Sequence, residues 1–264
     1  MPFLADHPPA PLLAALLAVA DRAAEATLRY YGGEAGTRYK ADRSPVTDAD
    51  EAAEAIILEE LRRLTPEVPV IAEEAVAAGH VPETAGGPFW LVDPLDGTKE
   101  FLSGNGEFTV NIGLVEGGRP ILGVVRAPAL GTSWYAAEGH GAYRRDGEGE
   151  RRIAVRRADP ARLVAVASRS HRDAETDAWL TRHGIAETVA AGSSLKFCVI
   201  AEGRADVYPR FGPTMEWDTA AGHAVLSIAG GHVVTVEGEP LGYGKPAFRN
   251  PGFVAYGGLE PFPA

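Results

Sequence analysis

Residues 90–101 hold the groups best suited to chemistry, because two carboxylates, a glycine and a threonine follow the end of an apolar strand. Asp93 and Asp96 stand three positions apart with Pro94 between them, and the carbonyl of Leu95 can turn toward the same point. Oxygen ligands of this kind suit Mg²⁺, a hard cation. The sequence therefore predicts a magnesium site at the end of this strand.

Gly97 and Thr98 follow at the position where a helix is expected to begin. The first N–H groups of a helix lack partners within it and bind anions. A phosphate monoester resists attack by water because its oxygens repel the nucleophile, and two metal ions about 3.5–4 Å apart counter that repulsion. The segment thus predicts divalent metal held beside phosphate.

Two further segments supply acids. A short apolar strand over residues 68–72 ends in Glu73 and Glu74, and Asp218 stands at the start of another predicted helix. The motifs DPLDGT (residues 93–98) and WDTAAG (residues 217–222) resemble those of the lithium-sensitive, magnesium-dependent phosphatases that include inositol monophosphatase and the bisphosphate nucleotidases. The resemblance covers nearly the whole chain.

This resemblance implies a fold, a cofactor and a set of ligands. The fold would be the two-lobed, layered α-β-α-β-α sandwich of the inositol monophosphatase (sugar phosphatase) type, with α+β and α/β parts, and the cofactor two to three Mg²⁺ ions. Glu73 is expected to be a surface acid or to lie behind the ligands. The implied metal ligands are Glu74, Asp93, Leu95 through its carbonyl, Asp96 and Asp218.

The resemblance also implies that Thr98 and Asp50 form the catalytic pair that orients and deprotonates the attacking water. Asp50 has a second interpretation, because Thr47 followed three residues later by an acid is typical of a capping box at a helix start. Asp48 is the alternative acid for the catalytic pair.

Other segments, at residues 40–47, 105–112, 192–198 and 208–214, resemble the bacterial 3'(2'),5'-bisphosphate nucleotidases of the family. Such an enzyme converts adenosine 3',5'-bisphosphate to AMP and phosphate and is linked to sulfate assimilation and nucleotide recycling. Arg210 stands about where inositol monophosphatases carry a glutamate that accepts hydrogen bonds from inositol hydroxyls. An arginine can bind a second phosphate through two donors, whereas a glutamate would repel it.

The expected substrate-binding residues are of two kinds, backbone N–H groups for the reacting phosphate and cationic or small residues for the rest of the substrate. They are Gly97, Thr98, Gly192, Ser193, Lys196, Arg210 and Asp218, with Arg169 and His171 as further cationic candidates.

The apolar pattern predicts how the chain positions these residues. Helical spacing over residues 13–28 and again after Thr47 predicts two amphipathic helices. Short apolar runs between residues 89 and 136 predict a strand meander, followed by a charged hairpin. Strands and helices then alternate, and the segment after Lys245 is expected to be irregular.

We therefore expect an N-terminal α+β lobe over residues 1–157, which carries most metal ligands. A C-terminal α/β lobe over residues 158–264 would complete the metal site and bind substrate. The acids of both lobes would meet in the cleft between them. Because crowded carboxylates repel one another, metal binding should stabilise the fold.

Composition excludes several classes of function. A net charge of −11 gives no sign of binding to a nucleic acid polymer, and the single cysteine, Cys198, excludes an intramolecular disulfide and suits a reducing cytoplasm. The apolar run at residues 12–20 is too short to span a bilayer and lacks a preceding Lys or Arg. We expect a cytoplasmic monomer or homodimer without a transmembrane segment, whose partner is a small phosphorylated nucleotide. Peripheral association with the inner membrane stays open.

Alternatives remain for the activity. An inositol monophosphatase or a fructose-1,6-bisphosphatase would use the same metal site. A haloacid-dehalogenase phosphatase needs two acids separated by one residue, whereas Asp93 and Asp96 are separated by two. A non-catalytic nucleotide or phosphate sensor belongs to a different class, and the full ligand set together with Thr98 argues against it.

Overall fold

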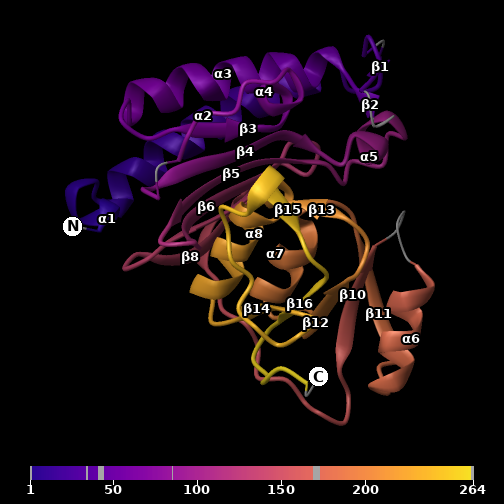
Figure 1. Ribbon diagram of the computed structural model, residues 1–264. Helices are drawn as coiled ribbons and strands as arrows, with labels where there is room; N and C mark the ends of the chain where they lie inside the picture. The colour runs from indigo at the N-terminus through magenta and orange to yellow at the C-terminus, as the bar shows by residue number, and fades with distance from the viewer. Residues whose placement is uncertain (1, 34, 41–44, 85, 169–172, 263–264) are drawn as a thin grey trace.

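The computed structural model describes residues 2–33, 35–40, 45–84, 86–168 and 173–262. Its main elements stack in five layers, which confirms the predicted α-β-α-β-α order (Figure 1). Helices α2 (Pro9–Leu28) and α3 (Asp48–Leu64) cover the outer face of a seven-stranded sheet. Helices α7 (Leu195–Ala201) and α8 (Glu216–Ile228) lie between that sheet and a five-stranded one, and α6 (Ala174–Arg182) packs on the far side.

The seven-stranded sheet follows the chain from strand to strand, as expected of a meander. Neighbouring strands are antiparallel except for the first pair, β3 and β4, which is parallel. The charged hairpin of the sequence forms its last two strands. The strands are β3 (Val70–Ala72), β4 (Phe89–Asp96), β5 (Thr109–Glu116), β6 (Arg119–Ala127), β7 (Thr132–Ala137), β8 (Gly141–Asp146) and β9 (Gly149–Arg152).

The five-stranded sheet has the order β11-β10-β12-β16-β14. The prediction of an irregular segment after Lys245 was wrong, because β16 runs antiparallel between β12 and β14 with all four residues buried. The strands are β10 (Val164–Ser168), β11 (Glu187–Ala191), β12 (Val207–Arg210), β14 (His232–Thr235) and β16 (Phe253–Tyr256).

Short elements surround the main layers. Two of them, α4 and α5, directly follow β3 and β4, and α4 begins with Glu73 and Glu74. They are α1 (Phe3–Asp6), β1 (Arg38–Tyr39), β2 (Pro45–Val46), α4 (Glu73–Ala77), α5 (Thr98–Leu102), β13 (Thr214–Met215), η1 (Pro246–Phe248) and β15 (Arg249–Asn250).

Helix α8 lies unusually close to the first sheet, and glycines make that approach possible. A Cβ atom at Gly123 of β6 would lie 2.3 Å from the carbonyl oxygen of Ala221, and one at Gly113 of β5 would lie 2.9 Å from the Cβ of Ala220. The start of α8, with Asp218, is thereby held near the end of β4. Because α8 belongs to the second half of the chain and packs on the sheet of the first, the lobe boundary at residues 157/158 stays a prediction.

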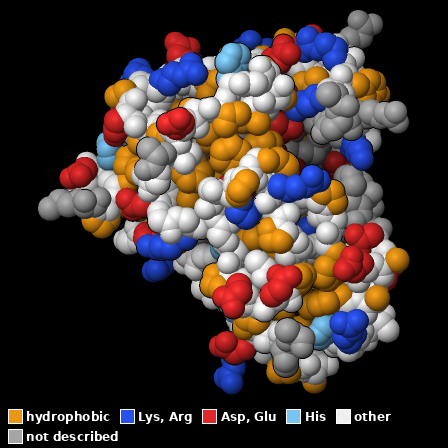
Figure 2. All heavy atoms as spheres, viewed as in Figure 1, with side chains coloured by type: hydrophobic (Ala, Val, Ile, Leu, Met, Phe, Trp, Pro, Cys, Tyr) orange, Lys and Arg blue, Asp and Glu red, His pale blue; other side chains and the backbone are white. Residues whose placement is uncertain are grey.

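The surface carries no continuous basic area on the face seen in Figure 2, where acidic and basic side chains are interspersed. Within the described ranges, the helices are all too short or too polar to cross a bilayer.

Candidate active site

The end of β4 brings Asp93 and Asp96 to one cavity. The pairing of β4 with β5 shifts register between these two residues, and the Leu95 N–H donates to Oδ1 of Asp93 over 3.0 Å. The irregular backbone around Pro94 therefore allows both acids to face the same space, although they are three positions apart. Both acids line the same cavity, as the sequence predicts.

That cavity has a volume of about 290 Å³ and receives residues from both halves of the chain. The acids in its lining are Glu73, Asp93, Asp96, Glu100 and Asp218. The cationic residues in its lining are Lys99, Lys196 and Arg210, and the last two come from the second half of the chain. Asp93 and Asp96 thus line one cavity together with Asp218, whereas Glu74 is not part of its lining.

Gly97 joins β4 to α5 in a conformation that other residues rarely adopt. Its φ is +88°, and a Cβ atom there would lie 2.1 Å from Oγ of Ser193. The Ser193 hydroxyl lies 2.9 Å from the carbonyl oxygen of Asp96 and 2.7 Å from that of Glu107. A glycine is therefore required where the second half of the chain contacts the turn after β4.

Ser194 links Asp96 to Asp218, a role that sequence reasoning missed. Its N–H donates to Oδ2 of Asp96 over 2.6 Å, and its hydroxyl lies 3.0 Å from that oxygen and 2.7 Å from the carbonyl oxygen of Asp218. Nδ2 of Asn111 donates to the Ser194 hydroxyl over 2.8 Å. Both residues fall in segments that resemble the nucleotidases, which was the only signal for them.

The buried acids are electrostatically costly. Burial raises the pKa of Asp93 well above its ordinary value, and repulsion by Glu73, Asp96 and Asp218 adds to that rise. Burial also raises the pKa of Asp218, with Asp96 and Glu73 adding to it. Burial raises the pKa of Asp96, although Lys196 and the hydrogen bonds from Ser194 and Asn111 oppose the rise. A cation among these acids would relieve the repulsion.

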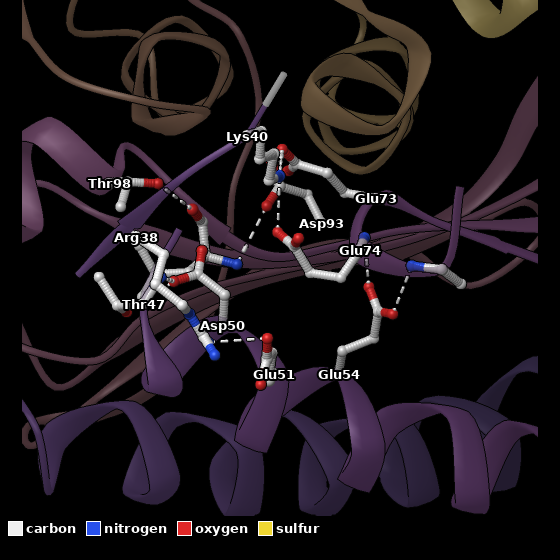
Figure 3. A network of polar contacts seen from close by, with 12 residues as sticks. Arg38, Lys40, Thr47, Asp50, Glu51, Glu54, Glu73, Glu74, Asp93 and Thr98 are labelled. Carbon is white, nitrogen blue, oxygen red and sulfur yellow. Dashed lines mark hydrogen bonds and ion pairs between the residues drawn. The ribbon is translucent and has the colours of Figure 1, made fainter. Parts of the chain in front are cut away.

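Glu73 and Glu74 both contact Lys40 (Figure 3), but they differ in whether they line the cavity. Nζ of Lys40 donates to Oε1 of Glu73 over 2.6 Å and to Oε1 of Glu74 over 2.7 Å. Only Glu73 lines the cavity, where it repels Asp93. Burial raises the pKa of Glu74 to about 7, despite the hydrogen bond from Lys40. The geometry favours Glu73, one position before the predicted Glu74, as the acid that shares the cavity with Asp93.

The donor set fits magnesium chemistry, although in the described part of the chain no three Asp, Glu, His or Cys side chains already stand together as a metal site. Oxygens that could bind a cation accept hydrogen bonds instead, such as Oδ2 of Asp218 from the Met215 N–H over 2.9 Å. Yet no Lys or Arg of the described ranges pairs with Asp93 or Asp218. Buried, unpaired carboxylates that supply only oxygen suit a hard divalent cation.

Asp50 lies behind the turn after β4 and caps α3, as the capping-box pattern predicts. Its Oδ2 accepts the Thr47 N–H over 2.8 Å and the Thr47 hydroxyl over 2.6 Å. The Thr98 hydroxyl donates to the Leu95 carbonyl over 3.5 Å, and no hydrogen bond joins it to Asp50 among the residues described (Figure 3). The catalytic pair of Thr98 and Asp50 therefore stays a prediction.

The alternative acid, Asp48, points elsewhere. Its side chain is 46% exposed and forms an ion pair with Arg38, whereas Asp50 is 2% exposed. Burial raises the pKa of Asp50 to about 6, although its hydrogen bonds with Thr47 lower it. A buried acid with a pKa near neutrality suits proton transfer better than an exposed one.

The cationic part of the cavity comes from α7 and β12. Nζ of Lys196 donates to the Ser193 carbonyl over 2.7 Å and lies 5.4 Å from the ring centre of Tyr208, and burial lowers the lysine pKa to about 8. Arg210 donates through Nη2 to the Pro213 carbonyl over 3.2 Å, but its buried Nε has no partner among the described residues. Because Arg210 lines the cavity, its guanidinium group is a candidate partner for an anion there.

The remaining predicted contacts differ in outcome. Gly192 does not line the cavity, but a Cβ atom there would lie 2.8 Å from the Glu107 carbonyl oxygen, so it allows the close approach of the segment that carries Ser193. Arg169 and His171 lie outside the described residues.

Comparisons with known proteins agree with this geometry. Residues 9–256 match the sequence model of the inositol monophosphatase family. The 3'(2'),5'-bisphosphate nucleotidase CysQ of Salmonella typhimurium is 50% identical over 238 residues, which cover 89% of this chain and 95% of that protein. CysQ of Escherichia coli K12 is 53% identical over 215 residues, which cover 81% of this chain and 86% of that protein.

Solved structures show the same fold. The crystal structure of CysQ from Bacteroides thetaiotaomicron has a TM-score of 0.78 and 40% identity, and the match covers 93% of this chain and 97% of that chain. The Thermotoga maritima IMPase has a TM-score of 0.78 and 28% identity, with 94% and 93% covered. The predicted fold and family are confirmed. This chain belongs to the inositol monophosphatase family.

Proposed function

We propose that this chain is a magnesium-dependent 3'(2'),5'-bisphosphate nucleotidase, which removes the 3'-phosphate of adenosine 3',5'-bisphosphate and gives AMP and phosphate. The observation that carries this proposal is a single cavity whose lining combines the acids Asp93, Asp96 and Asp218 with the cationic residues Lys196 and Arg210. The acids suit metal ions around the reacting phosphate, and the cations suit a second phosphate. The name of the curated relatives supports the same activity.

We propose two to three Mg²⁺ ions as the cofactor. Bound Mg²⁺ would lower the pKa of a water molecule and neutralise charge on the phosphoryl oxygens. The proposed ligands are oxygens of Asp93, Leu95 (carbonyl), Asp96, Asp218 and an acid at the start of α4, for which the cavity lining favours Glu73 over Glu74.

The remaining residues have proposed roles in positioning and proton transfer. Thr98 orients the attacking water and Asp50 accepts its proton, a role that suits a buried acid with a pKa of about 6. The N–H groups of Gly97 and Thr98 hold phosphoryl oxygens at the start of α5. Arg210 and Lys196, which both line the cavity, bind the second phosphate.

We also propose a division of the chain into two lobes. Residues 1–157 form a lobe that holds most metal ligands, and residues 158–264 form a lobe that adds Asp218 and the cations. A monomer or homodimer and a cytoplasmic or peripheral membrane location remain predictions.

Phosphate release from three substrates tests the function. We expect adenosine 3',5'-bisphosphate to be hydrolysed faster than inositol 1-phosphate or fructose 1,6-bisphosphate, with magnesium required and lithium inhibitory. Faster hydrolysis of either sugar phosphate would favour that alternative. Tight nucleotide binding without turnover, in the presence of magnesium, would favour a sensor.

The rate should depend on the ionisation of Asp50. A general base works when deprotonated, so kcat/KM should rise with pH through about 6, the pKa that burial gives Asp50. Thr47→Val removes a hydrogen bond that lowers this pKa, and the rising limb should therefore move to higher pH. A pH–rate profile measures the midpoint.

Thr65→Val is the matched control, because Thr65 is a buried threonine at the other end of α3, where its hydroxyl accepts from Trp90 Nε1 over 2.9 Å. In Thr65→Val, the pH at which kcat/KM rises should be the same as in the unaltered protein. If that pH is also unchanged in Thr47→Val, the result would contradict the role of Asp50.

A further inference from the structure

Glu54 holds the start of α4 through both oxygens of its carboxylate. Oε2 accepts the Glu74 N–H and Oε1 accepts the Ala75 N–H, each over 2.8 Å (Figure 3). These two residues lie in the first turn of α4, where N–H groups have no acceptor within the helix. A side chain from α3 therefore satisfies donors of the helix that carries Glu73 and Glu74.

Among the described residues, the other side-chain polar contacts of α4 are those of Lys40 with Glu73 and Glu74. The helix has five residues and none of them is buried. Its apolar contacts come from Ala75 and Val76, which are only partly buried. Because packing alone determines the orientation of such a short helix weakly, the two backbone hydrogen bonds that Glu54 accepts, together with the contacts of Lys40, restrain it.

Glu54 is a buried carboxylate, although a neutral acceptor could also cap a helix. The residue is 5% exposed, and among the described residues no Lys or Arg forms an ion pair with it. Burying an unpaired carboxylate is costly, but a carboxylate accepts both N–H groups at once in charge-assisted bonds. A glutamine could offer only one acceptor oxygen to the same two donors.

Glu54 also shares a helix with the proposed base. It stands one turn after Asp50 on α3, and residues four apart on a helix lie on the same face. α3 therefore presents one buried carboxylate toward the turn after β4 and the next toward α4. The position of α4 relative to the turn after β4 then depends on one rigid helix, α3.

We propose that Glu54 is a positioning residue for the metal site, which fixes the start of α4 so that the acids at residues 73 and 74 meet Asp93 and Lys40. This inference rests on the proposed metal-dependent function. Groups that orient ligands from behind typically change metal affinity about 10- to 100-fold when replaced. Loss of Glu54 should therefore weaken metal binding before it changes the chemical step.

Glu54→Gln tests this, with Glu59→Gln as the matched control, because Glu59 is an exposed glutamate on the same helix. Calorimetric titration of the metal-free proteins with Mg²⁺ should show binding about tenfold weaker in Glu54→Gln and unchanged in Glu59→Gln. The Mg²⁺ concentration for half-maximal rate should rise in parallel, while kcat at saturating Mg²⁺ is largely recovered. Equal Mg²⁺ affinity in both variants would overturn the proposal.

Hydrogen exchange of the unaltered protein gives a second measurement. The Glu74 and Ala75 amides should be protected, and rapid exchange of both would overturn the proposal.

A second variant, Glu54→Asp, keeps the charge but shortens the side chain. It should expose the same two amides to exchange and weaken Mg²⁺ binding, and it provides a test if Glu54→Gln fails to fold.

The two proposals fail in different ways. If the unaltered protein binds Mg²⁺ but prefers another phosphate ester, the role of Glu54 still stands and only the substrate changes. If the unaltered protein binds no Mg²⁺, the proposed function fails, and the role of Glu54 at a metal site fails with it even where the amides are protected.

Discussion

Replacing Asp93 by asparagine is expected to abolish hydrolysis and, at the same time, to make the metal-free protein more stable at neutral pH. Asp93 is 2% exposed, and burial followed by repulsion from Glu73, Asp96 and Asp218 raises its pKa. Its charge therefore opposes folding unless a cation is bound. We expect the rate to fall about 10³-fold or more, on the scale of losing one strong electrostatic contact in a transition state.

The sign of the stability change depends on pH. A carboxyl group whose pKa is raised by folding ionises in the unfolded chain at lower pH than in the folded one, so its destabilising effect appears above the ordinary pKa of about 4. The Tm of metal-free Asp93→Asn should therefore match the unaltered protein below that pH and exceed it increasingly toward pH 7. Thermal unfolding followed by circular dichroism, in the presence of EDTA, measures this.

Added magnesium should reverse the order of stability. Mg²⁺ binds the folded state only, so it should raise the Tm of the unaltered protein, but it should do so little or not at all in Asp93→Asn. Glu59→Gln removes one exposed charge from α3 and should behave like the unaltered protein in both conditions. A lower Tm of the metal-free variant, or retained hydrolysis, would contradict a metal-binding role for Asp93.

Calorimetric titration with Mg²⁺ also distinguishes between Glu73 and Glu74, the two acids of α4. Since Glu73 lines the cavity and Glu74 does not, Glu73→Gln should weaken Mg²⁺ binding more than Glu74→Gln. The opposite order would restore Glu74 as the ligand.

The central part of the site could be predicted because local rules fix it. Pro94 lies where the pairing of β4 is irregular, Gly97 separates β4 from α5, and Asp218 belongs to the first turn of α8. These constraints act within a few residues and can be read from the sequence. The choice between Glu73 and Glu74 depends instead on how the short helix α4 leaves β3, which the contact with Glu54 on another helix determines.

The features that were not predicted from the sequence, β16 and the contacts of Ser194, depend on tertiary pairing. β16 is a four-residue apolar run between glycines and prolines, and nothing local distinguishes it from a buried loop. Its extended form depends on hydrogen bonding to β12 and β14 on both sides. The link that Ser194 makes between Asp96 and Asp218 arises in the same way, because the three residues meet only after the sheets have packed.

Replacing Arg210 by glutamate is expected to lower kcat/KM for adenosine 3',5'-bisphosphate about 100-fold and to change that for inositol 1-phosphate much less. Arg210 lines the cavity, so its guanidinium group can donate to a phosphate oxygen there. A hydrogen bond to a charged group contributes about 1.5–3 kcal/mol, and a glutamate would add repulsion. A substrate with one phosphate does not use this contact.

Two further variants separate the possible causes of that loss. Arg210→Lys keeps the charge but not the planar pair of donors, so its kcat/KM for the bisphosphate should fall between those of the other two proteins. Arg62→Glu reverses an exposed charge on α3 and should leave both substrates unaffected. Equal losses for the bisphosphate and the monophosphate in Arg210→Glu would mean that Arg210 supports the acidic part of the cavity or its fold. The preference for a substrate with two phosphates would then need a different residue, and Lys196, with its buried ammonium group beside Ser193, would be the next to replace.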